Sequence, residues 1–410
     1  MFIHLNRPFL GPWHACGVAV LLLVSTTAHS QNDAPPSLAA SLEAAWSLSP
    51  SVRSLQSRQA ELNARQRASE ALLSSPPSVT LTHRNDRPAS NLGLREYEAE
   101  LGLPLWNPGV RSATAAQITA DRIAFDNQQR SAKLALAAQV RELAVNAALV
   151  ALERDLARRK QSEAQALAQD VQKRVTAGES ARVDALLVQA ASTQAAALAV
   201  QSEAALAQLQ GQWRALTGLT QIAQAAETDK EAAIGQHPLT ENAQARVRAA
   251  EARLALTDAD RRDPVELGVG VTRERSVFGE SAQNAVRLSV RIPFGGDNRN
   301  APRLAAARAE LDTALAEKEA IARQVEAEVA SARAALQAAR QAVSLAGERS
   351  ALSNEAQGLI AKSYQLGESD LPTRLRAESE RFDAELALAR ARTEQQRAVS
   401  RLNQAQGLLP

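Results

Sequence analysis

Four short stretches of the chain alternate between apolar and polar residues. The two clearest are residues 265–272 and 286–292, where Val, Leu or Ile fills every second position and Glu, Gly, Thr, Arg, Ser or another small or polar residue lies between. Residues 78–84 and 96–103 show a weaker form of the same alternation. A period of two predicts β-strands with one apolar and one polar face. A polar segment separates the members of each pair, so we expect two hairpins.

The rest of the chain shows the period of helices. Residues 108–175 and 303–365 contain almost no Gly or Pro. In the second of these stretches, apolar or small residues recur mostly three and four positions apart, at Leu311, Leu315, Ala322, Val325, Val329, Ala332, Leu336, Ala339 and Val343. This spacing is typical of coiled-coil packing, and about 65 residues of helix make a rod of roughly 100 Å. Two shorter stretches, 38–72 and 181–217, are predicted to be half-length helices beside the long ones.

The chain also repeats itself. The turn motif Gly-Glu-Ser occurs at 178–180 and again at 367–369, and a Pro between apolar residues occurs at 104 and again at 293, both 189 positions apart. Alanine-rich helices resemble one another trivially, so the Gly and Pro positions carry the argument for a tandem duplication. The predicted organisation is a first structural repeat at 31–219, a linker at 220–235 and a second structural repeat at 236–410.

The start of the chain has the features of a secretory signal peptide. Residues 1–30 contain a positive charge at Arg7, an apolar run at Gly17–Val24 and small residues before Gln31. The apolar run is too short for a transmembrane helix, which needs about 20 residues. We therefore expect 1–30 to be cleaved on export, which also removes Cys16, the only cysteine of the chain.

Composition narrows the class of protein. The net charge is +2, which gives no basic excess, so we expect no nucleic-acid partner. Aromatic residues make up only 3 % of the chain, and the apolar share of 45 % is carried largely by alanine. Such a composition suits long, closely packed helices and disfavours the thick core of most enzymes.

The sequence shows no pattern of a catalytic or metal site. It contains no nucleophile–base pair, no phosphate loop and no His/Cys cluster with ligand spacing. His83 falls in a predicted strand and His237 at the start of a predicted helix, so both are interpreted as structural residues. We therefore predict a protein that is not an enzyme, with no catalytic residue, no cofactor and no metal ligand.

The predicted hairpins leave apolar surface uncovered. An isolated hairpin is marginal in water, and its open edges invite pairing with another chain. One interpretation lays both hairpins on the helical body. The other pools hairpins from several chains into a closed membrane barrel, apolar outward and polar inward. A water-filled lumen suits the charged residues of the polar faces, because burying an unpaired charge is very costly; these are Glu98, Glu100, Arg287 and Arg291.

Together these features resemble the TolC-type outer membrane efflux proteins. The resemblance covers nearly all of residues 38–410 and rests on the signal peptide, the doubled helix–hairpin–helix plan and several motifs. The motifs are Leu-Pro-Leu-Trp-Asn-Pro-Gly at 103–109, Arg-Ile-Pro-Phe-Gly-Gly at 291–296, Arg-Val-Thr-Ala-Gly at 174–178 with Val-Asp at 183–184, and Tyr-Gln-Leu-Gly at 364–367.

The resemblance implies a mainly α fold with a membrane β-barrel. Three chains would form a homotrimer, each giving four strands to one twelve-stranded barrel in the outer membrane, and the helices would continue it as a coiled-coil α-barrel in the periplasm. The implied function is a passive export duct of a tripartite efflux system, for small molecules or metal cations. Its implied partners are outer membrane lipid, a periplasmic adaptor and an inner-membrane transporter of the proton-driven RND type.

The resemblance also assigns roles to the two turn glycines. Gly178 and Gly367 would lie at the periplasmic tips of the two helical hairpins, where the family docks the adaptor. A helical hairpin needs a residue with positive φ at its turn, and glycine takes this conformation without steric cost. A turn glycine with no further role is the alternative interpretation.

A periplasmic gate is implied at the same end. Asp184 and Tyr364 match positions whose polar links close the gate in the family. The family's arginine partner is replaced here by Ser369, and two aspartates that ring the entrance in some members are replaced by Thr373 and Arg376. The gate chemistry is therefore expected to differ from that of the family, and a ring of aspartates is not expected.

Two other functions are compatible with a chain of long helices. A periplasmic coiled-coil adaptor or scaffold protein is the main alternative, but adaptors place a single hairpin inside lipoyl and β-barrel domains and lack such a duplication. A periplasmic helical enzyme is disfavoured because no site is visible. Residues 292–296, Ile-Pro-Phe-Gly-Gly, are more similar to the heavy-metal and cation branch of the family than to the drug branch.

Overall fold

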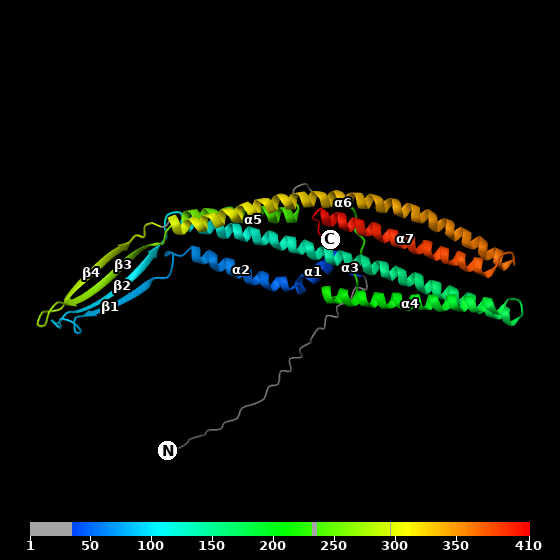
Figure 1. The fold of residues 1–410 in the computed structure, drawn as a ribbon, viewed down its shortest axis with the longest axis horizontal. Coiled ribbons are helices and arrows are strands. Elements are labelled where there is room, and N and C mark those ends of the chain that lie inside the picture. The colour runs from blue at the N-terminus through cyan, green and yellow to red at the C-terminus, as the bar shows by residue number, and fades with distance from the viewer. Residues whose placement is uncertain (1–34, 232–235, 296) are drawn as a thin grey trace, which may run out of the picture. The chain divides into compact units, whose positions relative to one another are not determined.

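The computed structural model describes residues 35–231, 236–295 and 297–410, so the predicted signal peptide lies outside the described residues. Residues Pro36–Pro410 form one unit, to which all elements below belong (Figure 1). In chain order the elements are α1 (Leu38–Leu48), α2 (Pro50–Ser69), β1 (Ser78–Asn85), β2 (Arg95–Leu105), α3 (Val110–Thr176), α4 (Arg182–Thr217), α5 (Pro238–Ala259), β3 (Val265–Arg275), β4 (Gln283–Arg291), α6 (Asp297–Gln365) and α7 (Leu371–Ala405).

Two helices are much longer than the others. α3 has 67 residues and α6 has 69, so each extends for about 100 Å. Each starts beside the strands and ends in a tight turn, from which α4 or α7 returns alongside it (Figure 1). The prediction of a mainly helical chain with long helices and four strands is confirmed.

The prediction of one continuous helix at 38–72 is wrong, because the structure has two helices there. The chain leaves helical conformation at Ser49, whose ψ is 131°, and a new helix begins at Pro50 and ends at Ser69. Proline has no N–H to donate and disfavours helical conformation in the residue before it. The Ser-Pro step therefore divides the predicted helix into α1 and α2.

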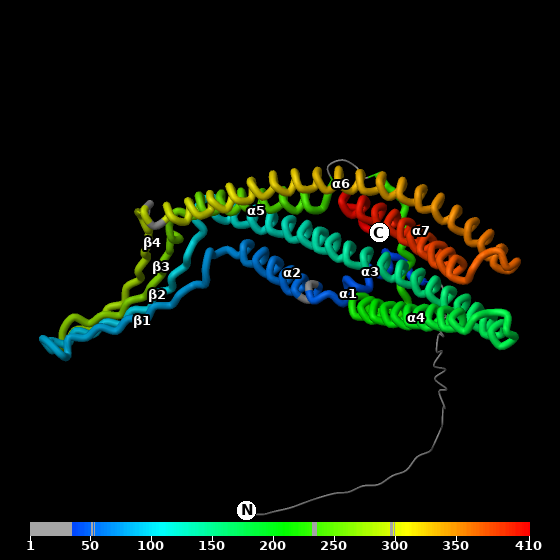
Figure 2. Tube along the Cα trace, turned by 45° about the vertical axis from the view of Figure 1, so that its right-hand side comes forward, coloured from blue at the N-terminus to red at the C-terminus, as the bar shows by residue number. Residues whose placement is uncertain are grey.

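Each long helix packs against shorter ones, and α3 contacts both halves of the chain. α3 contacts α1, α2 and α4 as well as α5 and α7, while α6 contacts α5 and α7; Figure 2 shows these helices side by side. The largest cluster of buried residues lies where α1, α3 and α4 meet, around Trp213. This side chain is fully buried, and its Nε1 donates a hydrogen bond to the carbonyl of Gln221 at 2.9 Å.

The packed face of α6 differs in part from the predicted stripe. Leu336 and Ala339 are buried against α7, as predicted. Leu315, however, is 39 % exposed, and Ala322 is exposed as well. Alanine occurs on every face of this helix, so the spacing of small residues does not reveal which face packs.

The four strands form one antiparallel sheet in the order β1-β2-β3-β4. The two expected hairpins are joined through the central strands, with Ala99 opposite Val271 and Leu101 opposite Val269. These central strands are longer than the alternation predicted, since β2 starts at Arg95 and β3 continues to Arg275. Within the described sheet, β1 and β4 each have a free outer edge.

One face of this sheet is apolar and exposed. The rows of facing residues on this face are aliphatic along β2 from Ala99 to Leu105, a span of about 20 Å. Leu81 at one edge is 77 % exposed and Leu288 at the other is 75 % exposed. A continuous apolar surface of this kind needs a covering medium other than water.

Two helices also contain apolar windows. α3 and α4 each have an 18-residue window with a mean hydropathy of 1.4, enough for a membrane span by length and composition alone. Of these windows, 39 % and 22 % respectively is buried within the chain. The apolar character comes largely from alanine on helices that pack against each other, so the window does not distinguish a span from a coiled-coil face.

If the apolar face meets lipid, as the membrane-barrel interpretation predicts, a charge placed on it should destabilise the protein. We expect Leu288→Arg to cost about 2–4 kcal/mol, because the residue lies in the middle of the apolar rows, where a lipid-facing Arg is most costly. The matched control is Ala285→Arg, on the polar face of the same strand, which should have little effect. Urea unfolding of the protein in lipid vesicles measures both. Equal losses would contradict the assignment of this face to lipid.

Candidate functional site

The polar face of the sheet carries charged side chains that are paired across the strands. Arg287 of β4 donates to Glu98 of β2, bridging β3. Ser289 Oγ donates to Glu100 at 2.6 Å, and Arg291 lies 3.4 Å from Glu266. The four charged residues predicted to line a lumen therefore lie on one face, and two of them, Glu98 and Arg287, form an ion pair.

Two glycines allow the carboxylates to lie flat against the sheet. A Cβ at Gly268 would lie 2.1 Å from Glu100 Oε1, and a Cβ at Gly102 would lie 2.3 Å from Glu266 Oε1. Any larger residue would push these glutamates away from the strands. The glycines thus leave room for the two carboxylates to lie close to the strands.

The two helical hairpins end in the same turn. Gly178 and Gly367 have φ values of 77° and 79°. The amide of the following residue donates to the carbonyl five positions earlier, Glu179 to Arg174 at 2.8 Å and Glu368 to Ser363 at 2.9 Å. A left-handed residue closing a helix in this way favours glycine. A Cβ at either glycine would meet nothing within 4 Å, so both tips are open to a partner.

Tyr364 lies where the two hairpins meet, close to the tips. Its ring packs beside a buried cluster made of Leu167, Val171, Val188 and Leu371. The guanidinium groups of Arg174, on α3, and Arg374, on α7, lie 5.4 and 4.9 Å from the centre of its ring. Tyr364 is therefore held by cation–π contacts from both hairpins, a feature that the sequence did not reveal.

Asp184, the other predicted gate residue, does not contact Tyr364 within the chain. Asp184 lies half-buried in the first turn of α4, where its negative charge interacts favourably with the helix dipole. Its amide donates to the carbonyl of Ala181 at 3.0 Å. Within the described part of the chain, the carboxylate of Asp184 has no ion pair or hydrogen bond. Asp184 and Tyr364 are therefore not a contacting pair inside one chain.

The positions where gate residues are replaced lie around the start of α7. Ser369 Oγ lies 3.4 Å from the carbonyl of Ile360, and Arg376 is exposed. Asp370 caps α7, since its Oδ1 accepts a hydrogen bond from the amide of Thr373 at 2.9 Å. Hydrogen bonds from Thr373 hold the pKa of Asp370 below its usual value. This turn is thus built around a helix cap rather than a ring of free acids.

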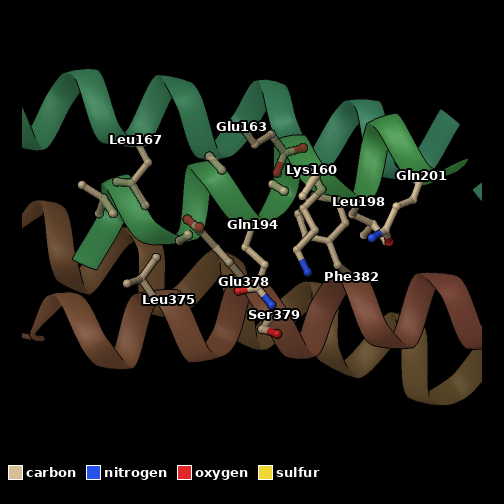
Figure 3. Close-up of a pocket in the computed structure, with 15 residues that line it drawn as sticks. Lys160, Glu163, Leu167, Gln194, Leu198, Gln201, Leu375, Glu378, Ser379 and Phe382 are labelled. Atoms are coloured by element: carbon tan, nitrogen blue, oxygen red, sulfur yellow. The ribbon is translucent and has the colours of Figure 1, made fainter. Parts of the chain in front are cut away.

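A groove of about 420 Å³ separates the hairpins farther from the tips. Its lining residues include Leu167 and Lys160 of α3, Leu198 of α4 and Phe382 of α7, and Figure 3 shows them on the facing sides of these helices. Three ion pairs cross the same seam between α3 and α7: Glu153–Arg390 at 2.9 Å, Arg159–Glu385 at 3.8 Å, and Glu163–Arg381. Ion pairs therefore link α3 to α7 beside a groove that side chains do not fill completely.

A buried ion pair fixes the segment between the two halves of the chain. Arg141 of α3 makes two hydrogen bonds with Glu227, at 2.8 and 2.9 Å, and the two side chains are only 3 % and 7 % exposed. Arg141 also donates to Gln404 Oε1 at 2.6 Å and to the carbonyl of Leu408 at 3.0 Å. Burial would raise the pKa of Glu227, but the bonds from Arg141 outweigh it and hold that pKa below its usual value.

Neighbouring residues of the segment bind the second half of the chain. Asp229 pairs with Arg340 of α6 at 3.2 Å. Asn403 of α7 donates to the carbonyl of Thr228 at 3.0 Å and accepts from the amide of Lys230 at 3.3 Å. The part of the predicted linker that the structure describes is therefore an ordered clamp on α3, α6 and α7.

The two histidines outside the predicted signal peptide have structural contacts. His83 stacks on Tyr97 with ring centres 4.5 Å apart. His237 Nδ1 accepts a hydrogen bond from the amide of Leu239 at 3.1 Å and caps α5. Among the residues that the structure describes, no group of three or more His, Cys, Asp or Glu is placed to hold a metal ion.

Comparison with known proteins points to one family. Residues 231–408 match the family described as outer membrane efflux protein. No curated protein matches the chain in sequence.

Solved structures match the fold over most of the chain. CusC has a TM-score of 0.74 at 18 % identity, covering 90 % of this chain and 92 % of that one. VceC from Vibrio cholerae has a TM-score of 0.70 at 16 % identity, covering 90 % and 96 %. The open state of MtrE from Neisseria gonorrhoeae has a TM-score of 0.70 at 17 % identity, covering 92 % and 90 %. At these identities the likeness shows the fold.

Proposed function

We propose that the chain is a TolC-type outer membrane efflux protein, the outer membrane channel of a tripartite efflux system, and that it conducts cargo passively, as a homotrimer, to the cell exterior. It lies in the outer membrane, and its helices extend into the periplasm. It is a transport protein, not an enzyme. The fold matches that of solved outer membrane channels, which favours the channel over the alternative of a periplasmic adaptor or scaffold.

The single observation that carries the proposal is the four-stranded sheet. It has an exposed apolar face, a charged face with paired side chains, and two open edges. Channels of this family form trimers, and three copies of this sheet would join edge to edge into twelve strands with no edge left open. The glutamates and arginines would then line the passage.

The helices have apolar faces that the single chain leaves uncovered. Along α6 and at the residue that follows it, leucines spaced seven residues apart are 64–68 % exposed: Leu345, Leu352, Leu359 and Leu366. On α4, Val183, Leu186 and Val200 are 57, 62 and 65 % exposed. A heptad of exposed leucines is the seam that a second helix covers in a coiled coil. These faces support contact with neighbouring copies in the proposed homotrimer.

The remaining roles stay proposals. The open turns at Gly178 and Gly367 would receive a periplasmic adaptor, which links the duct to an inner-membrane transporter, expected to be of the proton-driven RND type. Asp184 would contribute to the gate from a neighbouring copy, since its carboxylate is unpaired within the described chain. Tyr364 would contribute by holding the hairpins together through Arg174 and Arg374. Heavy-metal cargo, suggested by residues 292–296, remains a prediction.

Export by reassembled components tests this proposal. The chain, an adaptor and an inner-membrane transporter are expressed singly and together in cells that lack channels of this type. We expect intracellular metal cations or organic dyes to fall only when all three are present, and the class that falls identifies the cargo. Unchanged accumulation of both classes with a well-assembled trimer would contradict a role as an export duct.

A further inference from the structure

The apolar face of the sheet ends in a cluster of arginines. Beyond the row of Ala99 and Val271, the next row on this face pairs Tyr97 with Arg273, and the row after it pairs Arg95 with Arg275. We call Arg95, Arg273 and Arg275 the arginine rim. The rim lies toward the β1–β2 and β3–β4 loops, at the end of the sheet away from the helices (Figure 1).

The charges of the rim are not neutralised by the chain. Arg95 and Arg273 are exposed, and neither has an ion pair or hydrogen bond in the described residues. Arg275 donates weakly to the carbonyl of Gly93, at 3.4 Å, and lies 5.6 Å from the ring centre of Phe278. The arginines of the opposite face differ, since Arg287 and Arg291 both pair with glutamates.

The register makes this arrangement costly without a counter-ion. Arg95 and Arg275 face each other directly on neighbouring strands, and like charges in such positions destabilise a sheet. The neighbouring acids Glu96 and Glu274 stand opposite each other on β2 and β3. They are one position along from the rim residues, so they lie on the polar face, away from the rim. The carboxylate of Asp86 in the adjacent loop accepts from Ser90 Oγ at 2.9 Å and from the amide of Leu92 at 2.5 Å.

The position of the rim limits which anion can reach it. An aromatic pair, Tyr97 with His83, shares the row of Arg273 and borders the aliphatic rows, and such residues are typical of the boundary between lipid tails and headgroups. Arginine binds phosphate through two parallel hydrogen bonds, and its aliphatic stem can extend along an apolar surface. With the helices in the periplasm, the rim lies at the outer leaflet.

We propose that the arginine rim binds the phosphates of the outer-leaflet glycolipid. The headgroup phosphates would supply the counter-ions that Arg95 and Arg273 lack, while its acyl chains cover the aliphatic rows below. In the proposed trimer, the three rims would place such contacts around the whole barrel. The inference rests on the proposed barrel with its apolar face toward lipid, and it adds a lipid class that the barrel alone does not require.

Lipid bound to the purified trimer tests the proposal. The double variant Arg95→Gln, Arg273→Gln is compared with Arg287→Gln, Arg291→Gln, which removes the same charge from the polar face. Native mass spectrometry measures retention of bisphosphorylated lipid A. We expect about thirtyfold less retention in the rim variant, which corresponds to about 2 kcal/mol for two basic residues near an anionic lipid surface, and near wild-type retention in the control.

The wild-type trimer provides a second measurement. Its retention should fall with dephosphorylated lipid A and with high salt, but remain in the presence of inorganic phosphate at millimolar concentration, which separates lipid phosphate from free phosphate. Equal retention of phosphorylated and dephosphorylated lipid would overturn the proposal. Trimer yield and export are measured on the same samples. If export and assembly are normal while lipid selectivity is absent, the rim proposal fails and the duct stands; if the wild type forms no trimer, the duct itself fails.

Discussion

Replacing Glu227 with alanine should lower the free energy of unfolding by about 3–5 kcal/mol, because it leaves the Arg141 guanidinium buried without its counter-charge. The arginine cannot turn to solvent, since it is 3 % exposed and is held at the same time by Gln404 and Leu408. Urea unfolding of the purified protein, followed by circular dichroism, measures the loss. A cost below 1 kcal/mol would contradict a clamp at this segment.

The matched control is an exposed pair between α3 and α4. Arg158 and Glu203 lie 2.8 Å apart, but their side chains are 55 % and 47 % exposed. Glu203→Ala should therefore cost no more than about 1 kcal/mol. A double variant that replaces Arg141 and Glu227 with aliphatic residues should recover much of the loss, because it removes both buried charges together.

The same pair predicts a dependence on pH. The folded-state pKa of Glu227 is below its ordinary value of 4.5. Its contribution to stability is therefore complete above about pH 4.5 and is lost as the pH falls through the lowered folded-state value. Glu227→Gln removes this contribution, so the variant should lose less stability than the wild type over the acid range. Parallel pH profiles would contradict the assignment.

Bulky residues at the tips should abolish export while leaving the trimer intact. Gly178→Trp and Gly367→Trp would place an indole where each turn is open, and would block a helical partner from reaching the backbone. Both sites lie at the far ends of α3 and α6, about 100 Å from the strands, so membrane assembly should be unaffected. The measurement is crosslinking of the adaptor to the channel, alongside trimer yield and heat stability.

Alanine at the same positions separates steric blocking from backbone strain. The φ of 77° at Gly178 and 79° at Gly367 is unfavourable for any residue with a Cβ, by roughly 1–2 kcal/mol. Gly178→Ala carries this strain but adds little bulk, so it should keep adaptor crosslinking. Wild-type crosslinking in both tryptophan variants would show that the tips are ordinary turns and that the adaptor docks elsewhere.

Local patterns in the sequence predicted the elements better than their contacts. The period-two alternation located four strands, and the motifs at Gly178 and Gly367 located two turns with matching geometry. Both features depend on neighbouring residues only. The assignment of facing residues on α6 failed at Leu315 and Ala322 because alanine, present on every face, removes the contrast that marks a packed stripe.

Contacts between distant residues were missed for a different reason. Arg141 and Glu227 are 86 positions apart, and nothing in their local sequence shows that both are buried. The arginine rim was missed because the predicted strands ended at 96 and 272. Extending β2 to Arg95 and β3 to Arg275 brings three arginines onto the apolar face, where their charge becomes significant.

The central claim, that three chains close one barrel through their sheet edges, can be tested by disulfide crosslinking between β1 and β4. Leu81→Cys is combined in turn with Val286→Cys, Leu288→Cys and Val290→Cys, since the only native cysteine, Cys16, falls in the predicted signal peptide. Within one chain these strands are separated by β2 and β3, about 14 Å in all. A disulfide needs Cα atoms within about 7 Å, so only neighbouring copies can react.

Oxidation in outer membranes should then give a covalent trimer at one or more of the three β4 positions, and no larger species, while each single variant stays monomeric on a denaturing gel. The register between copies decides which β4 position reacts. Absence of interchain disulfides at all three positions, or a ladder of species longer than three, would contradict a closed barrel of three chains.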